Sequence, residues 1–145
     1  GAARAAVAAL LEERADAVHV LNRNPQRAAA LTASLDPAGR RVSALPDASS
    51  LRREGYDLVV NGTPLGLQVD DPPPLDLSEP ARVGAVLDLT YRPEGTAWVR
   101  DARGRGIPAA DGTEMLLRQG AAAFQRWFGT EPSLDVMRTA LYGSG

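Results

Sequence analysis

Two arginines that follow the first apolar run of the chain have the type and spacing of a phosphate-binding pair. Residues 17–21 are short and apolar, as a buried parallel strand should be, and the segment Asn22-Arg23-Asn24-Pro25-Gln26-Arg27 comes next. Because Pro25 is tolerated in the first turn of a helix, we expect Arg23 and Arg27 about one turn apart at a helix N-terminus. Guanidinium donors combined with the helix dipole favour a phosphate group. The alternative is a pair of ordinary solvated arginines.

A second polar segment, Asn61-Gly62-Thr63-Pro64-Leu65-Gly66, follows another apolar run. Its two glycines and its proline fix a sharp path and let the backbone come close to a ligand. Asn61 and Thr63 add hydrogen-bonding groups to this segment. A tight turn that binds no ligand is the alternative.

Tyr91 and Gln119 are the candidates for contacting a polar substrate. Tyr91 follows a third apolar run and offers a hydroxyl group, although a tyrosine packed on the rim of a sheet would give the same pattern. Gln119 shares a helical stripe with Met115, Ala123 and Trp127, so an amide stands where the pattern favours an apolar side chain. Leaving a buried amide unpaired costs about 1–3 kcal/mol. Either backbone groups satisfy Gln119, or it faces a crevice and binds a polar ligand.

The segment Asp111-Gly112-Thr113-Glu114 begins the longest predicted helix. Asp111 or Thr113 can cap that helix, and Gly112 can take a positive φ. Capping alone is sufficient to explain the acidic residue.

Each of these segments follows a predicted strand or begins a predicted helix. The sequence predicts strands over 17–21, 41–45, 56–61, 84–89 and 107–110, and helices over 1–11, 25–35, 48–54, 95–103, 113–128 and 134–141. Residues 69–74 contain three prolines in a row and are predicted to be a loop. The alternation of strands and helices indicates a Rossmann-type doubly wound α/β fold, with a parallel sheet covered on both faces.

The polar segments that follow the predicted strands are therefore expected at one edge of the sheet, where ligands of such folds bind at the carboxyl ends of the strands. These four segments are 22–27, 61–66, 88–92 and 111–114. Where the second strand of a dinucleotide-binding sheet ends, an acid binds the 2′-hydroxyl of NAD, whereas arginine accommodates the 2′-phosphate of NADP. Asn22 and Arg23 occupy that position here without an acid. If this segment binds a dinucleotide, its residues fit NADP better than NAD, and a pair of solvated arginines stays an equal alternative.

Composition excludes several classes of function. The 145 residues carry 16 basic and 18 acidic side chains, which leaves no basic footprint for a nucleic acid. The chain has no cysteine and a single histidine, His19, which argues against a disulfide framework, a metal site and a Ser-His-Asp triad. We expect His19 to be structural. No apolar run is long enough to span a bilayer, so the expectation is one soluble, cytoplasmic domain.

The first residues of the chain have the pattern of a helix that lacks its N-terminal cap. A strongly helix-favouring stretch begins at Gly1 with no N-cap residue before it. The first N–H groups of a helix need partners, so this pattern predicts that more chain precedes Gly1.

Five motifs, in order, resemble those of the shikimate dehydrogenase family, specifically its C-terminal NADP-binding domain. Gly1-Ala2-Ala3-Arg4 is similar to the end of that family's glycine loop, Gly-Ala-Gly-Gly-Ala-Ala-Arg, and residues 22–27 are similar to Asn-Arg-Thr-x-x-Arg, with Asn24 in place of threonine. Residues 57–66 resemble Asp-Leu-Val-Val-Asn-Ala-Thr-Pro-Leu-Gly, with Gly62 in place of alanine. Residues 88–93 match Asp-x-x-Tyr-x-Pro, and residues 111–119 match Asp-Gly-x-x-Met-Leu-x-x-Gln, which an aromatic tail follows.

The resemblance implies an NADP-dependent oxidoreductase that reduces 3-dehydroshikimate to shikimate in aromatic amino-acid biosynthesis. Tyr91 and Gln119 would hydrogen-bond the substrate. The cofactor-binding residues carried over from the family are, from the pyrophosphate loop to the 2′-phosphate and the nicotinamide half, Gly1, Ala2, Asn22, Arg23, Asn24, Arg27, Thr63, Leu89 and Gly112.

The family's catalytic Lys and Asp lie in an N-terminal domain, and this chain contains no lysine at all. The first strand and the leading Gly-Ala-Gly of the glycine loop are also absent. The resemblance therefore implies that residues 1–145 form the NADP-binding domain, with no catalytic residue of their own and with the N-terminal domain of the same enzyme as their partner. Such a piece is expected to be inactive and to bind the cofactor weakly. A homodimer is left open.

The sequence leaves two alternative functions open. A quinate/shikimate dehydrogenase paralogue would share the motifs; some of these enzymes prefer NAD and carry an acid near the end of the second strand, which Asn22 and Arg23 argue against. A non-catalytic nucleotide-binding module could use the same scaffold. Such a module would not need Tyr91 and Gln119 to face the crevice.

Overall fold

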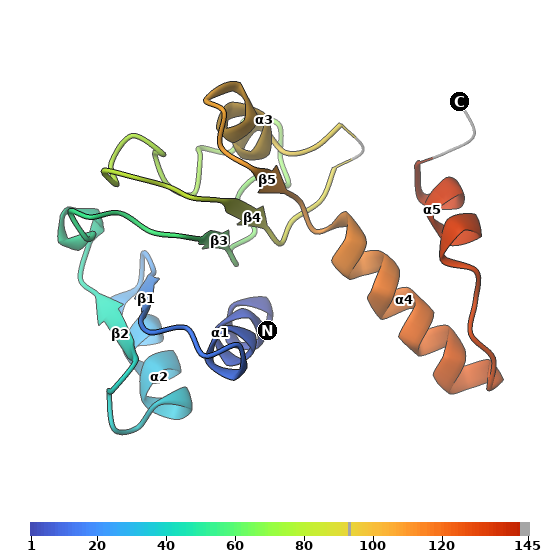
Figure 1. The fold of residues 1–145 in the computed structure, drawn as a ribbon, viewed down its shortest axis with the longest axis horizontal. Helices are drawn as coiled ribbons and strands as arrows, with labels where there is room; N and C mark the ends of the chain where they lie inside the picture. Colours follow the sequence, from blue (N-terminus) through green and yellow to red (C-terminus); the bar gives the residue numbers. More distant parts are fainter. Residues whose placement is uncertain (93, 143–145) are drawn as a thin grey trace.

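Strands and helices alternate along the chain in the computed structural model, which describes residues 1–92 and 94–142 (Figure 1). The strands are β1 (Val18–Leu21), β2 (Val42–Leu45), β3 (Val59–Asn61), β4 (Val86–Asp88) and β5 (Ala109–Ala110). The helices are α1 (Ala2–Glu12), α2 (Pro25–Leu35), α3 (Ala97–Gly104), α4 (Thr113–Phe128) and α5 (Leu134–Tyr142), with a short 3₁₀ turn, η1 (Ala48–Ser50). None of the described helices is long and apolar enough to cross a membrane.

The strands form two parallel sheets. In the first, β1 pairs with β2 in the register Val18 with Val42 and Leu21 with Leu45. The second has the order β3-β4-β5. Among the described residues no pairing joins β1 to β3, so the prediction of parallel strands is confirmed while the sheet itself is divided. A dinucleotide-binding sheet has the strand order 3-2-1-4-5-6, and the unpaired position between β1 and β3 corresponds to its first strand.

Each sheet has its own apolar core. On the first sheet, α1 and α2 bury a cluster centred on Val7, Val18 and Val42. On the second, α3 covers β4 and β5 and buries Trp98 and Ala102 beside Val86. A fully buried apolar side chain the size of valine contributes roughly 1.5–3 kcal/mol to folding. The two cores therefore hold the strands from which the polar segments emerge.

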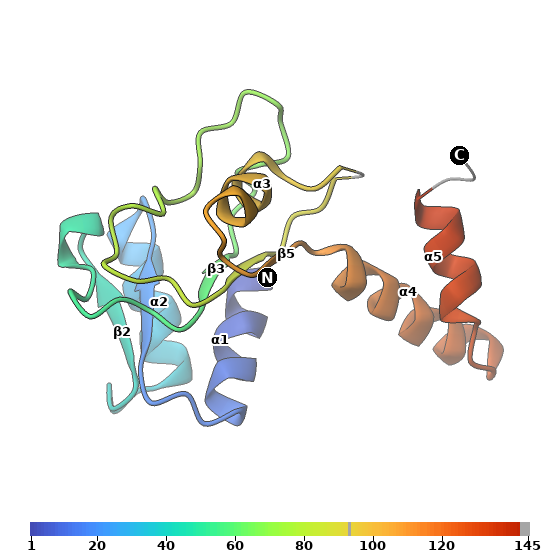
Figure 2. The same ribbon diagram turned by 45° about the horizontal axis from the view of Figure 1, so that its top comes forward.

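Two contacts connect these halves. A Cβ added to Gly62, directly after β3, would lie 3.0 Å from the Cβ of Ala3 in α1, so the start of α1 packs closely against the β3 exit. Figures 1 and 2 both show the N-terminus of α1 beside the second sheet. In addition, Nδ1 of His19 in β1 lies 2.8 Å from the hydroxyl of Tyr56, which precedes β3. The start of α1 is therefore at the same edge as the strand exits.

The predicted helix over 48–54 is wrong beyond its first turn. Only η1 is helical, and Leu51 adopts an extended ψ of 147°. The backbone N–H of Arg52 donates to the Tyr56 hydroxyl at 3.1 Å, so a side chain binds the amide that a longer helix would have used. The strand predicted over 56–61 is also shorter, because Tyr56 forms only an isolated bridge with Val83 before β3 begins.

Helix α4 has the predicted bounds but not the predicted burial. It leaves the sheet after β5 and packs against α5, away from the two sheets (Figures 1 and 2). Arg138 of α5 donates to Glu114 of α4 at 2.8 Å, which ties the two helices together. Trp127 and Phe128 are 76% and 65% exposed. The stripe that the sequence predicts as apolar is real, but the described residues leave much of it in solvent.

Candidate functional site

The segment after β1 presents its two arginines as predicted. Oδ1 of Asn24 accepts the backbone N–H of Arg27 at 3.1 Å, and Asn24 has an extended backbone, so it is the N-cap of α2. Oδ1 of Asn22 accepts the N–H of Asn24 at 2.8 Å and fixes the turn before the helix. Pro25 occupies the first helical turn. The sequence pattern therefore builds a capped helix start.

Arg23 and Arg27 are both exposed at this helix start. Within residues 1–92 and 94–142, neither guanidinium group takes part in an ion pair, whereas Arg138 and Arg105 do. Two unpaired cations beside a helix N-terminus attract an anion through both their charge and the helix dipole. This arrangement fits a phosphate group.

The segment after β3 is fixed by the side chain of Asn61, which is only 2% exposed. Its Nδ2 donates to the carbonyl of Leu65 at 2.9 Å and to Oδ1 of Asp88 at 2.8 Å. Its Oδ1 accepts the N–H and the hydroxyl of Thr63 at 2.9 and 2.7 Å. Asn61 therefore has no group left for a ligand and acts by shaping the loop.

Thr63 is bonded within the same loop. Its Oγ1 donates to Asn61 and also accepts the N–H of Leu65 at 3.2 Å. At the loop's end, Gly66 has a φ of +100°, which favours glycine. The turn is therefore rigid without a ligand, as its proline and glycines predict.

Gly112 lies where the segment after β5 meets the segment after β4. Its N–H donates to the carbonyl of Thr90 at 2.8 Å, and a Cβ at this position would lie 2.5 Å from the carbonyl oxygen of Leu89. The prediction of a positive φ is wrong, because Gly112 has a φ of −73°. Glycine is required here by close packing rather than by backbone conformation. Oδ1 of Asp111 accepts the N–H of Thr113, the first residue of α4, at 3.0 Å, but the N-cap is Gly112, so Asp111 binds the helix start from one residue before the cap.

Tyr91 and Gln119 are both exposed in the structure. Tyr91 is 43% exposed after β4. Gln119 is exposed on α4, so the expectation that it is a buried amide is wrong. The reason is that α4 projects away from the sheets, and among the described residues no hydrogen bond joins the side chains of Tyr91 and Gln119. Both side chains are open to a ligand.

Gly1 and Ala2 are exposed at the start of α1, beside the β3 exit that Ala3 contacts. Leu89 is half-buried between Asp88 and Thr90 at the end of β4. These residues and Gly112 thus lie at the carboxyl edge of the second sheet, where ligands of α/β folds bind.

One functional candidate, Asp88, is not singled out by the sequence beyond its place in a motif. It is fully buried at the last position of β4. The Thr90 hydroxyl and N–H and the Thr96 hydroxyl all donate to its carboxylate. An acid that closes an apolar strand and precedes two threonines is the signal that could have identified it.

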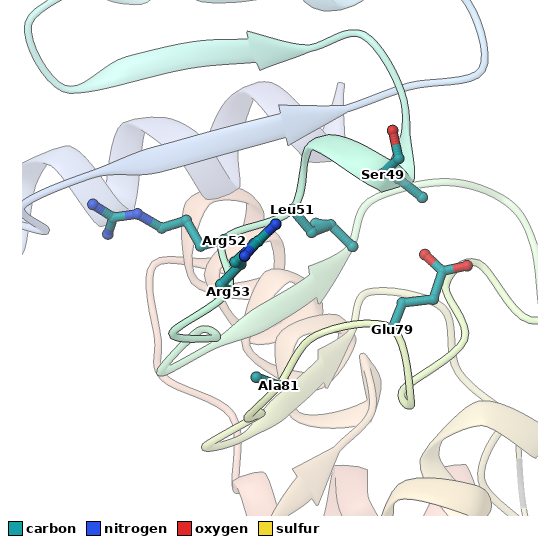
Figure 3. A pocket seen from close by; sticks show the side chains of 7 residues that line it. Ser49, Leu51, Arg52, Arg53, Glu79 and Ala81 are labelled. Atoms are coloured by element: carbon teal, nitrogen blue, oxygen red, sulfur yellow. The ribbon is translucent and has the colours of Figure 1, made fainter.

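Two cavities are found in the described part of the chain, and only the second is lined by residues of the strand exits, Gly66 and Arg92. One, of about 550 Å³, is lined by residues that precede β3 and β4, with Arg52 and Glu79 on opposite sides of it (Figure 3). The other, of about 660 Å³, lies between the proline-rich segment 66–74 and α3. The first cavity faces the amino ends of its strands, so it does not fit the position expected for a nucleotide.

The surroundings of the His19 ring change its pKa. Partial burial, together with the nearby positive charge of Arg52, lowers its pKa from the ordinary value of 6.5. The Tyr56 hydroxyl accepts the backbone N–H of Arg52 at 3.1 Å and is also hydrogen-bonded to Nδ1 of His19. His19 is thus part of the junction between the sheets, in agreement with a structural role.

The sequence and the fold are both similar to those of shikimate dehydrogenases. A family model described as the shikimate 5'-dehydrogenase C-terminal domain matches residues 112–142. The shikimate dehydrogenase (NADP(+)) of Rubrobacter xylanophilus is 42% identical over 148 residues, which cover 100% of this chain and 52% of the relative.

Solved structures give the same result. The shikimate 5-dehydrogenase of Thermus thermophilus in complex with NADP(H) and shikimate is 39% identical, with a TM-score of 0.72, over 93% of this chain and 49% of that one. The quinate dehydrogenase of Corynebacterium glutamicum in complex with NAD is 30% identical, with a TM-score of 0.81, over 97% of this chain and 52% of that one. The chain thus spans about half the length of the relatives that it matches.

Proposed function

We propose that the chain belongs to the shikimate dehydrogenase family and is the coenzyme-binding part of an NADP-dependent enzyme that reduces 3-dehydroshikimate to shikimate. The observation that carries this proposal is the pair Arg23 and Arg27, exposed and without ion pairs among the described residues, at the capped start of α2. Arginine at the end of this strand accommodates the 2′-phosphate that distinguishes NADP from NAD.

The remaining coenzyme contacts follow from the positions of the strand exits. Gly1 and Ala2, at the start of α1, would hold the pyrophosphate beside a helix N-terminus. Thr63, Leu89 and Gly112 would line the nicotinamide half. The tight packing of Gly112 against the Leu89 carbonyl leaves backbone, rather than side chain, on this surface. In this proposal residues 1–145 are one NADP-binding domain.

The chemistry divides between the coenzyme and the protein. NADPH supplies the hydride that reduces the ring ketone. Tyr91 and Gln119 would orient the substrate through its hydroxyl and carboxylate groups, since both side chains are exposed and carry hydrogen-bonding groups. The developing alkoxide needs a proton donor. The resemblance to the family assigns this role to a Lys and an Asp of an N-terminal domain, and the 145 residues contain no lysine.

We therefore place the catalytic acid outside this chain, in the part of the enzyme that the relatives have and that this chain does not cover. The purified chain is expected to bind NADP without oxidising shikimate. Turnover of shikimate by the chain alone, followed as NADPH absorbance, would contradict this division.

Arginine substitution tests the coenzyme proposal directly. The double variant Arg23→Ala/Arg27→Ala should bind NADP about ten- to hundredfold more weakly, because solvent screening reduces the contribution of the exposed pair to about the 1.5–3 kcal/mol of one charge-assisted hydrogen bond. Its affinity for NAD, which lacks the 2′-phosphate, should change by no more than about twofold. Isothermal titration calorimetry measures both dissociation constants.

A matched control is Arg40→Ala/Arg53→Ala, which removes two exposed arginines that lie away from the β1 exit. This variant should bind NADP like the unmodified chain. If both double variants lose NADP affinity equally, general charge rather than a specific site holds the coenzyme.

The quinate dehydrogenase remains the second candidate, because its fold superposes with a TM-score of 0.81. That enzyme's structure is a complex with NAD, whereas the β1 exit here carries arginine and no acid. A preference of this chain for NAD over NADP would favour that candidate.

A further inference from the structure

We propose that Asp88 is the positioning residue of the crevice: its buried carboxylate sets the spacing of the loops that leave β3 and β4 and of the start of α3. The inference rests on the proposed function in one respect, namely that these loops hold the nicotinamide half of the coenzyme. Asp88 itself touches no ligand in this account and acts through the groups that it binds.

The carboxylate of Asp88 is fully buried and is divided between three segments. Its Oδ1 accepts Nδ2 of Asn61 at 2.8 Å, from the β3 exit, and the hydroxyl and N–H of Thr90 at 2.8 and 3.0 Å, from the β4 exit. Its Oδ2 accepts the hydroxyl of Thr96 at 2.7 Å, from the start of α3. One side chain thus bonds to all three segments.

Each residue that binds Asp88 also forms hydrogen bonds with backbone groups. Asn61 fixes the amide of Thr63 and the carbonyl of Leu65, and the Thr96 hydroxyl accepts the N–H of Val99 as the N-cap of α3. The carbonyl of Thr90 accepts the N–H of Gly112 at 2.8 Å. The chain of bonds therefore reaches the segments after β3, β4 and β5.

A gain in folding stability does not by itself explain why the Asp88 carboxylate is buried. Among the described residues Asp88 has no ion-pair partner, and its four donors are neutral groups. Burying a carboxylate is costly, and replacing a buried polar group and its partners by apolar side chains often stabilises a protein. What an apolar cluster cannot do is fix three backbone segments in defined directions, because hydrophobic contact has no direction.

Thr96 offers a test of this coupling at a distance from the loops. Thr96→Val keeps the shape of the side chain but removes the hydroxyl that donates to Oδ2, whereas Thr96→Ser keeps the donor. If Asp88 couples the segments, Thr96→Val should speed hydrogen exchange of the Thr63 and Leu65 amides about tenfold or more in the unliganded chain, and Thr96→Ser should leave both rates unchanged. NMR detects these amides one by one.

A variant of matched instability separates coupling from a general loss of stability. Val42→Ala weakens the other core, away from Asp88. If Val42→Ala speeds exchange at Leu65 as much as Thr96→Val does, or if Thr96→Val leaves Leu65 unchanged, the positioning role is wrong. This readout needs no coenzyme, so it stands even if the proposed function fails.

Coenzyme binding supplies the second readout. Asp88→Asn can accept at only one of the two oxygen positions, so it should weaken NADPH binding about tenfold while binding of adenosine 2′,5′-bisphosphate, which lacks the nicotinamide, changes less than about twofold. Equal loss for both ligands would show that Asp88 only maintains the fold. Equal affinity of the unmodified chain for both ligands would also overturn the proposal, since these loops would then hold no part of the coenzyme. No binding of either ligand would instead contradict the proposed function.

Discussion

At the scale of single residues, His19 shows how a side chain can join the two sheets. Its Nδ1 lies 2.8 Å from the Tyr56 hydroxyl, and both partial burial and Arg52 lower its pKa from 6.5. A histidine with a lowered pKa in the folded protein is protonated more readily when the chain unfolds. The folded state is therefore favoured by the neutral ring.

This linkage predicts a pH dependence of stability. As the pH falls through 6.5, protons bind the unfolded chain first, so the free energy of unfolding should decrease toward the lower pKa of the folded state. His19→Gln should remove this part of the slope between about pH 7.5 and about pH 5.5. Urea unfolding at the two pH values measures it, and an unchanged slope in the variant would count against a lowered pKa of His19.

Residue types at the site are predicted better than their roles. The Arg23 and Arg27 pair and the bond from Asp111 to the first amide of α4 follow from local spacing, which the sequence displays directly. The sequence predicts burial of Gln119 wrongly, because a stripe on a helix shows only which side chains share a face. It does not show what packs on that face, and in this structure the face is open.

At the scale of elements, the junction of β4 with α4 depends on Gly112. A methyl carbon added at this position would lie 2.5 Å from the Leu89 carbonyl oxygen, which leaves no room for a side chain. Gly112→Ala should lower the free energy of unfolding by about 1–3 kcal/mol, as overpacking against a fixed backbone does. Chemical denaturation measures the change.

Gly104 provides the matched control, because a Cβ there meets no atom within 4 Å. Gly104→Ala should be neutral or slightly stabilising, since alanine favours a helix more than glycine does. If both alanine variants destabilise the chain to the same degree, the close approach at Gly112 is not the cause.

Elements with a complete local signal are predicted accurately. Pro25 and the polar residues before it predict the start of α2, and α4 begins at Thr113 and ends at Phe128 in the structure as the sequence predicts. The prediction for the segment 48–54 is wrong because the Tyr56 hydroxyl takes the amide of Arg52. The competing side chain lies four residues after Arg52, beyond the end of the predicted helix.

At the scale of the whole molecule, two small sheets stand side by side, and α4 with α5 extends beyond them (Figure 2). The division into two sheets could not be read from the strands themselves, since each has the pattern of a buried strand whichever neighbour it pairs with. The common edge of strand exits was predictable, because parallel strands end on the same side. Coenzyme selection at that edge is the central claim.

The most direct test of that claim is the ratio of the NAD and NADP dissociation constants of the unmodified chain, measured by calorimetry at one salt concentration. If Arg23 and Arg27 bind the 2′-phosphate, NADP should bind at least about tenfold more tightly than NAD. Equal affinities, or a preference for NAD, would contradict the account.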